Sequence, residues 1–169
     1  MWRRGLGVLG MIGAAVAAAG CDDTATEPDA SPTEQVAYID GMVQHHQIAM
    51  VRADEALAKA NRAGLKALAT RIKTDQMREV AQFKAIRQQL TGSDTTPPAM
   101  VPQPIPAGPE FERQWLTMMI NHHQGAIDQS TLAHGSNVRS TLDSLAHSII
   151  AVQQREQQEF RDSLRVYYP

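Results

Sequence analysis

The sequence has a single cysteine, few aromatic residues and no run of basic residues. Cys21 cannot form a disulfide within the chain. Aromatic residues make up only 5% of the 169 residues, while Ala, Gln and Leu are abundant, which favours helices over a sheet. No block of lysine or arginine would suit nucleic acid, and no nucleophile triad or phosphate-binding loop supports a hydrolase or a nucleotide-binding protein.

The first 20 residues have the pattern of a secretory signal. Arg3 and Arg4 precede an apolar run over residues 6–19, which is shorter than the roughly 20 residues that a membrane span needs. Small residues then lead to Cys21, in a position that resembles the lipobox of bacterial lipoproteins, although Ala18 stands where Leu is usual. We expect cleavage before Cys21, lipidation of its thiol and a membrane anchor in the cell envelope, on the periplasmic or extracellular side. Ordinary secretion with a free thiol is the alternative.

The remaining chain divides into a short tether and one domain. Without Arg3 and Arg4 the 16 basic residues become 14, against 18 acidic residues, so the mature chain carries a formal charge of −4. Residues 21–33 are polar and contain two prolines, which predicts a flexible tether. We expect residues 34–166 to form a single domain, because a chain of this length can bury a core of its own.

This domain contains an internal repeat. An offset of 77 residues aligns residues 42–49 (MVQHHQIA) with residues 119–126 (MINHHQGA) without a gap. Between residues 42 and 83, 15 of the 42 aligned pairs are identical. Both copies carry a His-His pair and a Gln-x-x-Glu, so any site built from them has pseudo-two-fold symmetry. A repeat of this length indicates two copies of one supersecondary unit.

Start and stop signals divide each copy into two helices. The segment Ser31-Pro-Thr-Glu34 has the pattern of a helix N-terminus, with Ser as the cap and Glu three residues later. We expect helices over about 32–60, 65–90, 110–134 and 138–166. Residues 91–109 hold six of the nine prolines and predict an extended linker between hairpins 34–90 and 110–166. The fold class is therefore all-α: a four-helix bundle made of two duplicated helical hairpins joined by a proline-rich crossover.

Helical periodicity places polar side chains in the predicted core. His46 and His123 fall within apolar stripes, and His45 and His122 flank them. Four side chains of the second and fourth helices also face inward: Gln76, Glu79, Gln153 and Glu156. The His-His pairs and the glutamates are equidistant from their turns, so we expect each pair to face the glutamate of its own hairpin near mid-height.

Such a buried polar cluster indicates a metal site. Burying charged or unpaired polar groups costs several kcal/mol unless a partner satisfies them, and imidazoles with carboxylates on facing helices hold metal ions in bundles. The candidate ligands are His45, His46, His122, His123, Glu79, Glu156, Met42 and Met119. Imidazole with thioether favours copper, with iron or zinc as alternatives. The two inward-facing glutamates supply fewer carboxylates than a di-iron oxidase needs.

Three functional readings follow from this cluster. The first is an exported, lipid-anchored protein that binds copper as a buffer, carrier or tolerance factor, without catalysis. The second is a ferritin-like metal-dependent oxidoreductase. The third is a structural envelope lipoprotein whose histidines and glutamates form a metal-free hydrogen-bond network, with the methionines as apolar filler. The oligomeric state and the delivery partner are left open.

The repeated motif resembles domain-of-unknown-function family 305. The resemblance rests on Met119-Ile-Asn-His-His-Gln-Gly-Ala-Ile127, on its copy and on the following Gln-x-x-Glu, and it covers nearly all of residues 34–166. It implies a ferritin-like four-helix bundle, export and, for some members, copper binding or tolerance. By motif, it places the family's histidines and acidic partners on the six His and Glu residues above. Ile48 stands where the family often has Gly, which predicts crowding of the first copy's half-site.

Overall fold

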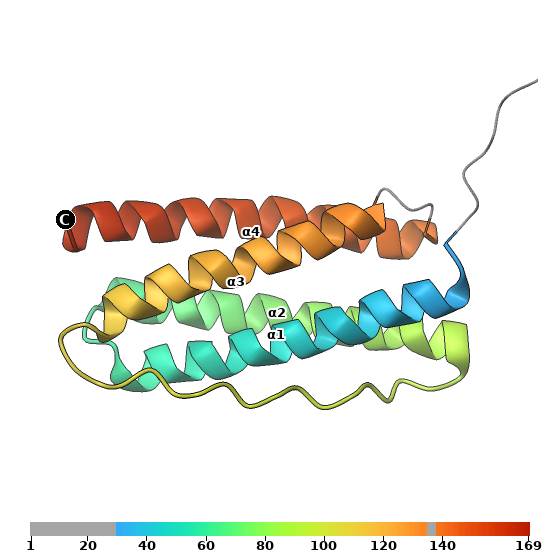
Figure 1. Ribbon diagram of the computed structural model, residues 1–169, viewed down its shortest axis with the longest axis horizontal. Coiled ribbons are helices and arrows are strands. Elements are labelled where there is room, and N and C mark those ends of the chain that lie inside the picture. The colour runs from blue at the N-terminus through green and yellow to red at the C-terminus, as the bar shows by residue number, and fades with distance from the viewer. Residues whose placement is uncertain (1–29, 135–137) are drawn as a thin grey trace, which may run out of the picture.

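The computed structural model describes residues 30–134 and 138–169, which form four α-helices (Figure 1). They are α1 (Pro32–Lys59), α2 (Ala63–Thr91), α3 (Phe111–His134) and α4 (Ser140–Tyr167). The predicted signal at residues 1–20 and the lipidation site Cys21 lie outside the described residues. No helix in the described ranges is both long enough and apolar enough to cross a membrane.

Local sequence explains where these helices begin and end. The Ser31 hydroxyl accepts a hydrogen bond from the backbone N–H of Glu34, and the Glu34 carboxylate accepts one from the Ser31 backbone, forming the predicted capping box. At the C-terminal end of α2, Gly92 adopts a left-handed conformation with φ of 75°, and its N–H donates to the carbonyl of Gln88. Glycine adopts this conformation without steric strain, and the helix α2 ends here.

The helices pair as two hairpins, α1 with α2 and α3 with α4. The structure confirms the predicted fold class of an all-α bundle built from two hairpins, and its helices begin and end within two residues of the expected positions. Between the hairpins, α1 and α3 are packed more closely than α2 and α4. The interface of α1 with α3 therefore holds the two halves together.

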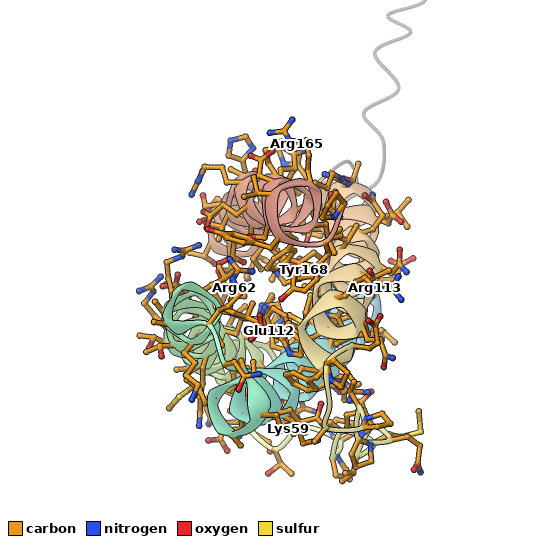
Figure 2. The ribbon with its side chains drawn as sticks, turned by 90° about the vertical axis from the view of Figure 1, so that its left-hand side faces the viewer. Lys59, Arg62, Glu112, Arg113, Arg165 and Tyr168 are labelled. Carbon is orange, nitrogen blue, oxygen red and sulfur yellow. The ribbon has the colours of Figure 1, made fainter. Side chains whose placement is uncertain are left out.

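The proline-rich crossover decides the topology, which the sequence left open. It runs along α1 in the direction of that helix: Gln44 donates to the carbonyl of Pro98, and Lys59 donates to the carbonyl of Ile105. The chain thus returns to the end of the bundle where α1 stops, and α3 starts there (Figure 1). As a result α3 runs antiparallel to α1. Figure 2 faces this end, where Glu112 accepts hydrogen bonds from the Tyr168 hydroxyl and the Arg62 backbone.

The core has two apolar halves with polar residues between them. One apolar cluster lies toward the α1–α2 turn and includes Trp115 and Phe160, and the other lies toward the α3–α4 turn and includes Ile39 and Phe83. Both clusters draw on all four helices. The helix positions between them carry the repeated His-His and Gln-x-x-Glu motifs. The polar side chains of the repeated motifs thus lie in the middle of the bundle, between the two apolar clusters.

Candidate metal centre

The repeated motifs place eight polar side chains in the middle of the bundle, two from each helix, which we call the central polar layer. Its members are His45, His46, Gln76, Glu79, His122, His123, Gln153 and Glu156. Six of them are buried, and His45 and His122 are partly exposed. All six His and Glu residues that the sequence predicted for a metal site lie in this layer.

The second histidine of each pair binds the glutamate of its own hairpin. His46 Nε2 lies 2.7 Å from Glu79 Oε2, and His123 Nε2 lies 2.9 Å from Glu156 Oε2. Both histidines are 0% exposed. Each ring also meets a phenylalanine edge to face, His46 with Phe83 at 5.8 Å and His123 with Phe160 at 5.0 Å between ring centroids. The two half-sites therefore repeat one geometry.

The first histidine of each pair has a different neighbour. Their rings lie across the interface of α1 with α3, with the centroids of His45 and His122 3.7 Å apart and the planes inclined by 40°. Neither has a hydrogen bond to a glutamate side chain. The expectation that both histidines of a pair face their own glutamate was therefore wrong for these two, because the antiparallel packing of α1 and α3 turns them toward each other.

The stacked pair lies on the pseudo-two-fold axis that relates the two hairpins. The hydrogen bond between Tyr38 and Ser130 lies seven residues before His45 on α1, and the one between Trp115 and the Arg52 carbonyl lies seven residues after it. His45 and His122 are themselves repeat counterparts, separated by the 77-residue offset. A residue that contacts its own counterpart must lie on the symmetry axis.

The glycine of the second motif lies beside a histidine of the first. A Cβ atom at Gly125 would meet His45 Nε2 at 3.4 Å, so glycine at this position leaves room at that nitrogen. The residue after His-His-Gln therefore borders the histidine of the other copy. By the repeat symmetry, Ile48 would border His122 of the other copy, and the predicted crowding of the first half-site stays a prediction.

Burial keeps the stacked imidazoles neutral. Loss of hydration lowers the pKa of His45 to about 4, with a smaller contribution from the charge of His46. The same cause, followed by the charge of His45, lowers the pKa of His122 to about 2. Both rings are therefore uncharged well below neutral pH. A neutral imidazole has a free nitrogen lone pair, which is the form that binds metal ions.

Several polar atoms of the layer are buried without a hydrogen-bond partner. They are Nδ1 of all four histidines, Nε2 of His122, both amide atoms of Gln76 and Gln153, and Oε1 of Glu156. Each such group costs about 1–3 kcal/mol relative to a satisfied one. The layer is thus rich in nitrogen and oxygen atoms without a hydrogen bond from the protein, which fits the chemistry of a metal-binding site.

This layer is not a preassembled polydentate site. Within residues 30–134 and 138–169, no three His, Cys, Asp or Glu side chains are gathered closely enough to hold an ion together. Asp40 of α1 does not add a carboxylate to the layer, because it binds Arg87 at 2.8 Å. The donor set fits an ion that accepts few nitrogen ligands better than a carboxylate-rich di-iron centre.

The two candidate methionines lie in the apolar clusters on either side of the layer. Met42 belongs to the cluster with Ile39, Met119 to the cluster with Trp115, and both are 0% exposed. Their sulfur atoms are therefore within the core, where they fill apolar volume. Their role as ligands stays a prediction.

Two features of the layer were missed in the site prediction. Gln76 and Gln153 were recognised as inward-facing but not as members of the site, although their repetition in both copies was the available signal. Arg71 was not singled out at all. Its Nε lies 3.8 Å from Glu156 Oε1, and its Nη2 lies 2.6 Å from Glu159 Oε2. The signal for Arg71 was a difference between the copies, since its counterpart is Ser148.

The sequence profile described as "Domain of unknown function (DUF305)" matches the chain over residues 35–105 and 99–164. The chain belongs to this family. The two matched segments each contain one copy of the His-His motif, as the repeat requires. No match was found among curated proteins.

Solved structures with this fold include CopM and another member of the family. CopM in a silver-bound form is 29% identical, with a TM-score of 0.71 over 80% of this chain and 98% of CopM. Its Cu(I)-bound form is also 29% identical, with a TM-score of 0.68 over the same shares. A DUF305 fragment from Deinococcus radiodurans is 25% identical, with a TM-score of 0.65 over 81% of this chain and 98% of the fragment. CopM has also been solved in apo and Cu(II)-bound forms.

Proposed function

We propose that this protein binds copper in its central polar layer and serves as a buffer, carrier or tolerance factor. The observation that carries the proposal is the set of four imidazoles in the middle of the bundle, each with a buried Nδ1 that lacks a hydrogen-bond partner. The similarity to CopM, which has been solved with Cu(I) and with silver, supports copper as the ion.

In this proposal the histidines that bind glutamate and the histidines that contact each other have different roles. The glutamates hold Nε2 of His46 and His123, which fixes the ring orientation and leaves Nδ1 as the free nitrogen. This is the role that carboxylates commonly play for metal-bound histidines. His45 and His122 stay neutral and offer further lone pairs. Met42 and Met119 would add soft thioether ligands if the adjoining core repacks.

The proposed setting is the cell envelope. Cleavage before Cys21 and lipidation of that residue would anchor the bundle to a membrane, with the metal site on the periplasmic or extracellular side. The argument rests on the basic and apolar pattern of residues 1–20. Mass spectrometry of the protein from its native host tests it, because an unmodified thiol at Cys21 or an uncleaved N-terminus would exclude the anchor.

Metal analysis of the purified protein tests copper binding directly. We expect protein isolated from its own compartment to contain copper, and a variant with His46→Ala and His123→Ala to contain less than about a tenth as much, since two lost ligands cost several kcal/mol. A variant with His134→Ala and His147→Ala is the matched control, because these two histidines are exposed and lie outside the layer. Equal copper in all three proteins would contradict the proposal.

A metal-free polar core is the second candidate, and one observation favours it. His46 and His123 already have glutamate partners, so part of the layer is satisfied without an ion. A ligand of the native state must raise stability by mass action. If the melting temperature is the same with EDTA and with Cu(I), Cu(II), Zn(II) or Fe(II), the structural role is correct. Metal-dependent oxygen consumption would instead favour the oxidoreductase.

A further inference from the structure

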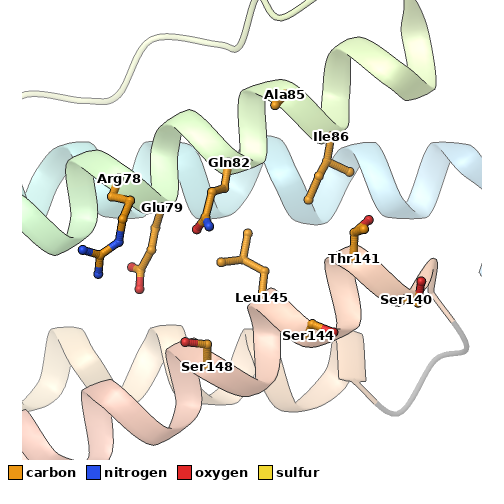
Figure 3. Close-up of a pocket in the computed structure, with 10 residues that line it drawn as sticks. All are labelled: Arg78, Glu79, Gln82, Ala85, Ile86, Ser140, Thr141, Ser144, Leu145 and Ser148. Carbon is orange, nitrogen blue, oxygen red and sulfur yellow. The ribbon is translucent and has the colours of Figure 1, made fainter.

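The loosely packed side of the bundle contains a groove that reaches the central polar layer. It has a volume of about 560 Å³ and lies between α2 and α4. Glu79 lines it, and in Figure 3 its carboxylate extends from α2 toward α4 near Ser148. The same carboxylate binds His46 Nε2. The groove therefore leads from solvent to a side chain that touches a fully buried imidazole.

The lining of this groove is mainly polar on the side of α4. Hydroxyl groups form most of that wall, and the remaining members include an amide, a guanidinium and a few apolar side chains. They are Ser140, Thr141, Ser144 and Ser148, with Arg78, Gln82, Ala85, Ile86 and Leu145. The charge of Arg78 is balanced by Asp75, 2.7 Å away. Hydroxyl and amide oxygens can replace part of the water around a cation, and Glu79 supplies the negative charge at the inner end.

At the equivalent place in the second copy, an arginine lies beside the glutamate. The counterpart of Ser148 is Arg71, whose guanidinium lies beside Glu156 and binds Glu159 at 2.6 Å. The counterpart of Glu159 is Gln82, which lines the open groove. Two substitutions between the copies thus replace an arginine–glutamate pair over Glu156 by a serine and a glutamine beside Glu79. A bulky guanidinium paired with Glu159 thus stands beside Glu156, where the first copy has only a serine hydroxyl.

We propose that the groove between α2 and α4 is the passage by which a copper ion reaches and leaves the central polar layer, with Glu79 as the first carboxylate it meets, and that Arg71 blocks the equivalent passage at Glu156. This rests on the proposed copper binding. The two half-sites are chemically alike, and the passage makes them unequal. Copper is exchanged through the first half-site, and the second is sealed from solvent.

Exchanging the two residue pairs between the copies tests the passage. A closed variant carries Ser148→Arg and Gln82→Glu, which reproduces the pair formed by Arg71 and Glu159. An open variant carries Arg71→Ser and Glu159→Gln. The measurement is the first-order rate at which Cu(I) leaves the loaded full-length protein into excess coloured chelator, at chelator concentrations where the rate no longer changes.

We expect the rate of Cu(I) release from the closed variant to be about one tenth of the wild-type rate or lower, equivalent to a barrier higher by at least about 1.4 kcal/mol. The open variant should release Cu(I) faster than the wild type. The direction is diagnostic, because an added positive charge that acted only by repulsion would speed release. Uptake should slow by a similar factor, leaving Kd nearly unchanged. A variant with Gln154→Arg and Gln158→Glu adds the same pair of charges at exposed positions of α4 and should leave the rate unchanged.

The outcomes separate this proposal from the proposed function. Unchanged or faster release from the closed variant overturns the passage while copper binding stands. A wild-type protein that takes up no copper overturns the proposed function, and the passage with it. Circular dichroism and melting temperature show whether each variant folds. If the closed variant does not fold, the open variant decides alone: faster release supports the passage and an unchanged rate refutes it.

Discussion

At the scale of single residues, the two histidines of each pair differ in their partners. His46 and His123 are fully buried and bind glutamates within their hairpins. His45 and His122 stack on each other and have no carboxylate partner. The difference of one position along a helix rotates the side chain by about 100°, which is enough to move it from one interface to another. Two adjacent and chemically identical residues thus acquire different neighbours.

Removing the carboxylate partner of a buried histidine should destabilise the metal-free protein. Glu79→Ala leaves His46 without its hydrogen bond in a dry interior, and we expect a loss of about 1–3 kcal/mol in the free energy of unfolding. Urea denaturation measures it. Glu110→Ala is the control, because Glu110 is exposed and pairs only with Arg113 on the surface; its effect should stay within about 0.5 kcal/mol.

The stability of the metal-free protein should fall in weak acid. The pKa of His45 is lowered to about 4 and that of His122 to about 2, whereas both are near 6.5 in the unfolded chain. Below pH 6.5 the unfolded chain therefore takes up protons that the native protein does not. Their contribution is complete above pH 6.5 and is lost progressively toward pH 4, with His122 continuing to pH 2, by at most about 1.4 kcal/mol per pH unit for each ring.

Urea midpoints at pH 7, 6, 5 and 4 measure this dependence. A variant with His45→Gln and His122→Gln should show a shallower decline over the same range, because it lacks the two groups whose pKa values change on folding. An equally steep decline in that variant would show that other groups are responsible.

At the scale of the elements, turn chemistry sets the lengths of the helices. The capping box of Ser31 with Glu34 starts α1, and the left-handed Gly92 ends α2 and begins the crossover. Both signals are local, since they depend on residues within one turn of the helix end. For this reason the helix boundaries could be predicted from sequence alone to within two residues.

Replacing the two glycines at the ends of α2 by alanine should change the free energy of unfolding in opposite directions. Gly92→Ala forces a Cβ into the left-handed region at φ of 75°, and we expect a loss of about 1–2 kcal/mol. Gly64→Ala lies within the helix with no atom within 4 Å of the added Cβ, and should stabilise by up to about 1 kcal/mol. Thermal unfolding compares the two variants with the wild type. The same sign for both would contradict this account of the helix end.

At the scale of the whole molecule, the contact of α1 with α3 joins the two halves. Trp115 is fully buried in it and donates from Nε1 to the carbonyl of Arg52 at 2.7 Å. Arg52 in turn donates to the carbonyl of Gln103 in the crossover. On this side of the bundle α1, α3 and the crossover are therefore bound together. The groove lies on the other side, between α2 and α4.

Replacing this tryptophan should weaken the junction of the hairpins. Trp115→Phe removes the donor to the Arg52 carbonyl and leaves a small cavity, and we expect a loss of about 2–4 kcal/mol. Chemical denaturation gives the magnitude. Tyr167→Phe is the comparison, since that side chain is 55% exposed, and it should change stability by less than about 0.5 kcal/mol. A tryptophan variant as stable as this control would mean that the junction depends on other contacts.

The sequence by itself determined the repeat, the four helices and the set of polar side chains that enter the core. It also placed each His-His pair opposite the glutamate of its own hairpin, because a hairpin with a short turn brings residues equidistant from the turn to one height; the structure shows this contact for His46 and His123. These features follow from periodicity and turn chemistry, which act over a few residues. That is why all eight members of the central polar layer could be named from the sequence, six of them as candidate ligands.

Only the tertiary structure decided how the two hairpins meet. The crossover could have reached either end of the bundle, and its path along α1 makes α3 antiparallel to α1. That orientation puts His45 against His122 on the symmetry axis, sets Gly125 beside His45 and brings Arg71 over Glu156. These contacts join residues from different hairpins, so they depend on packing between surfaces that no local pattern specifies.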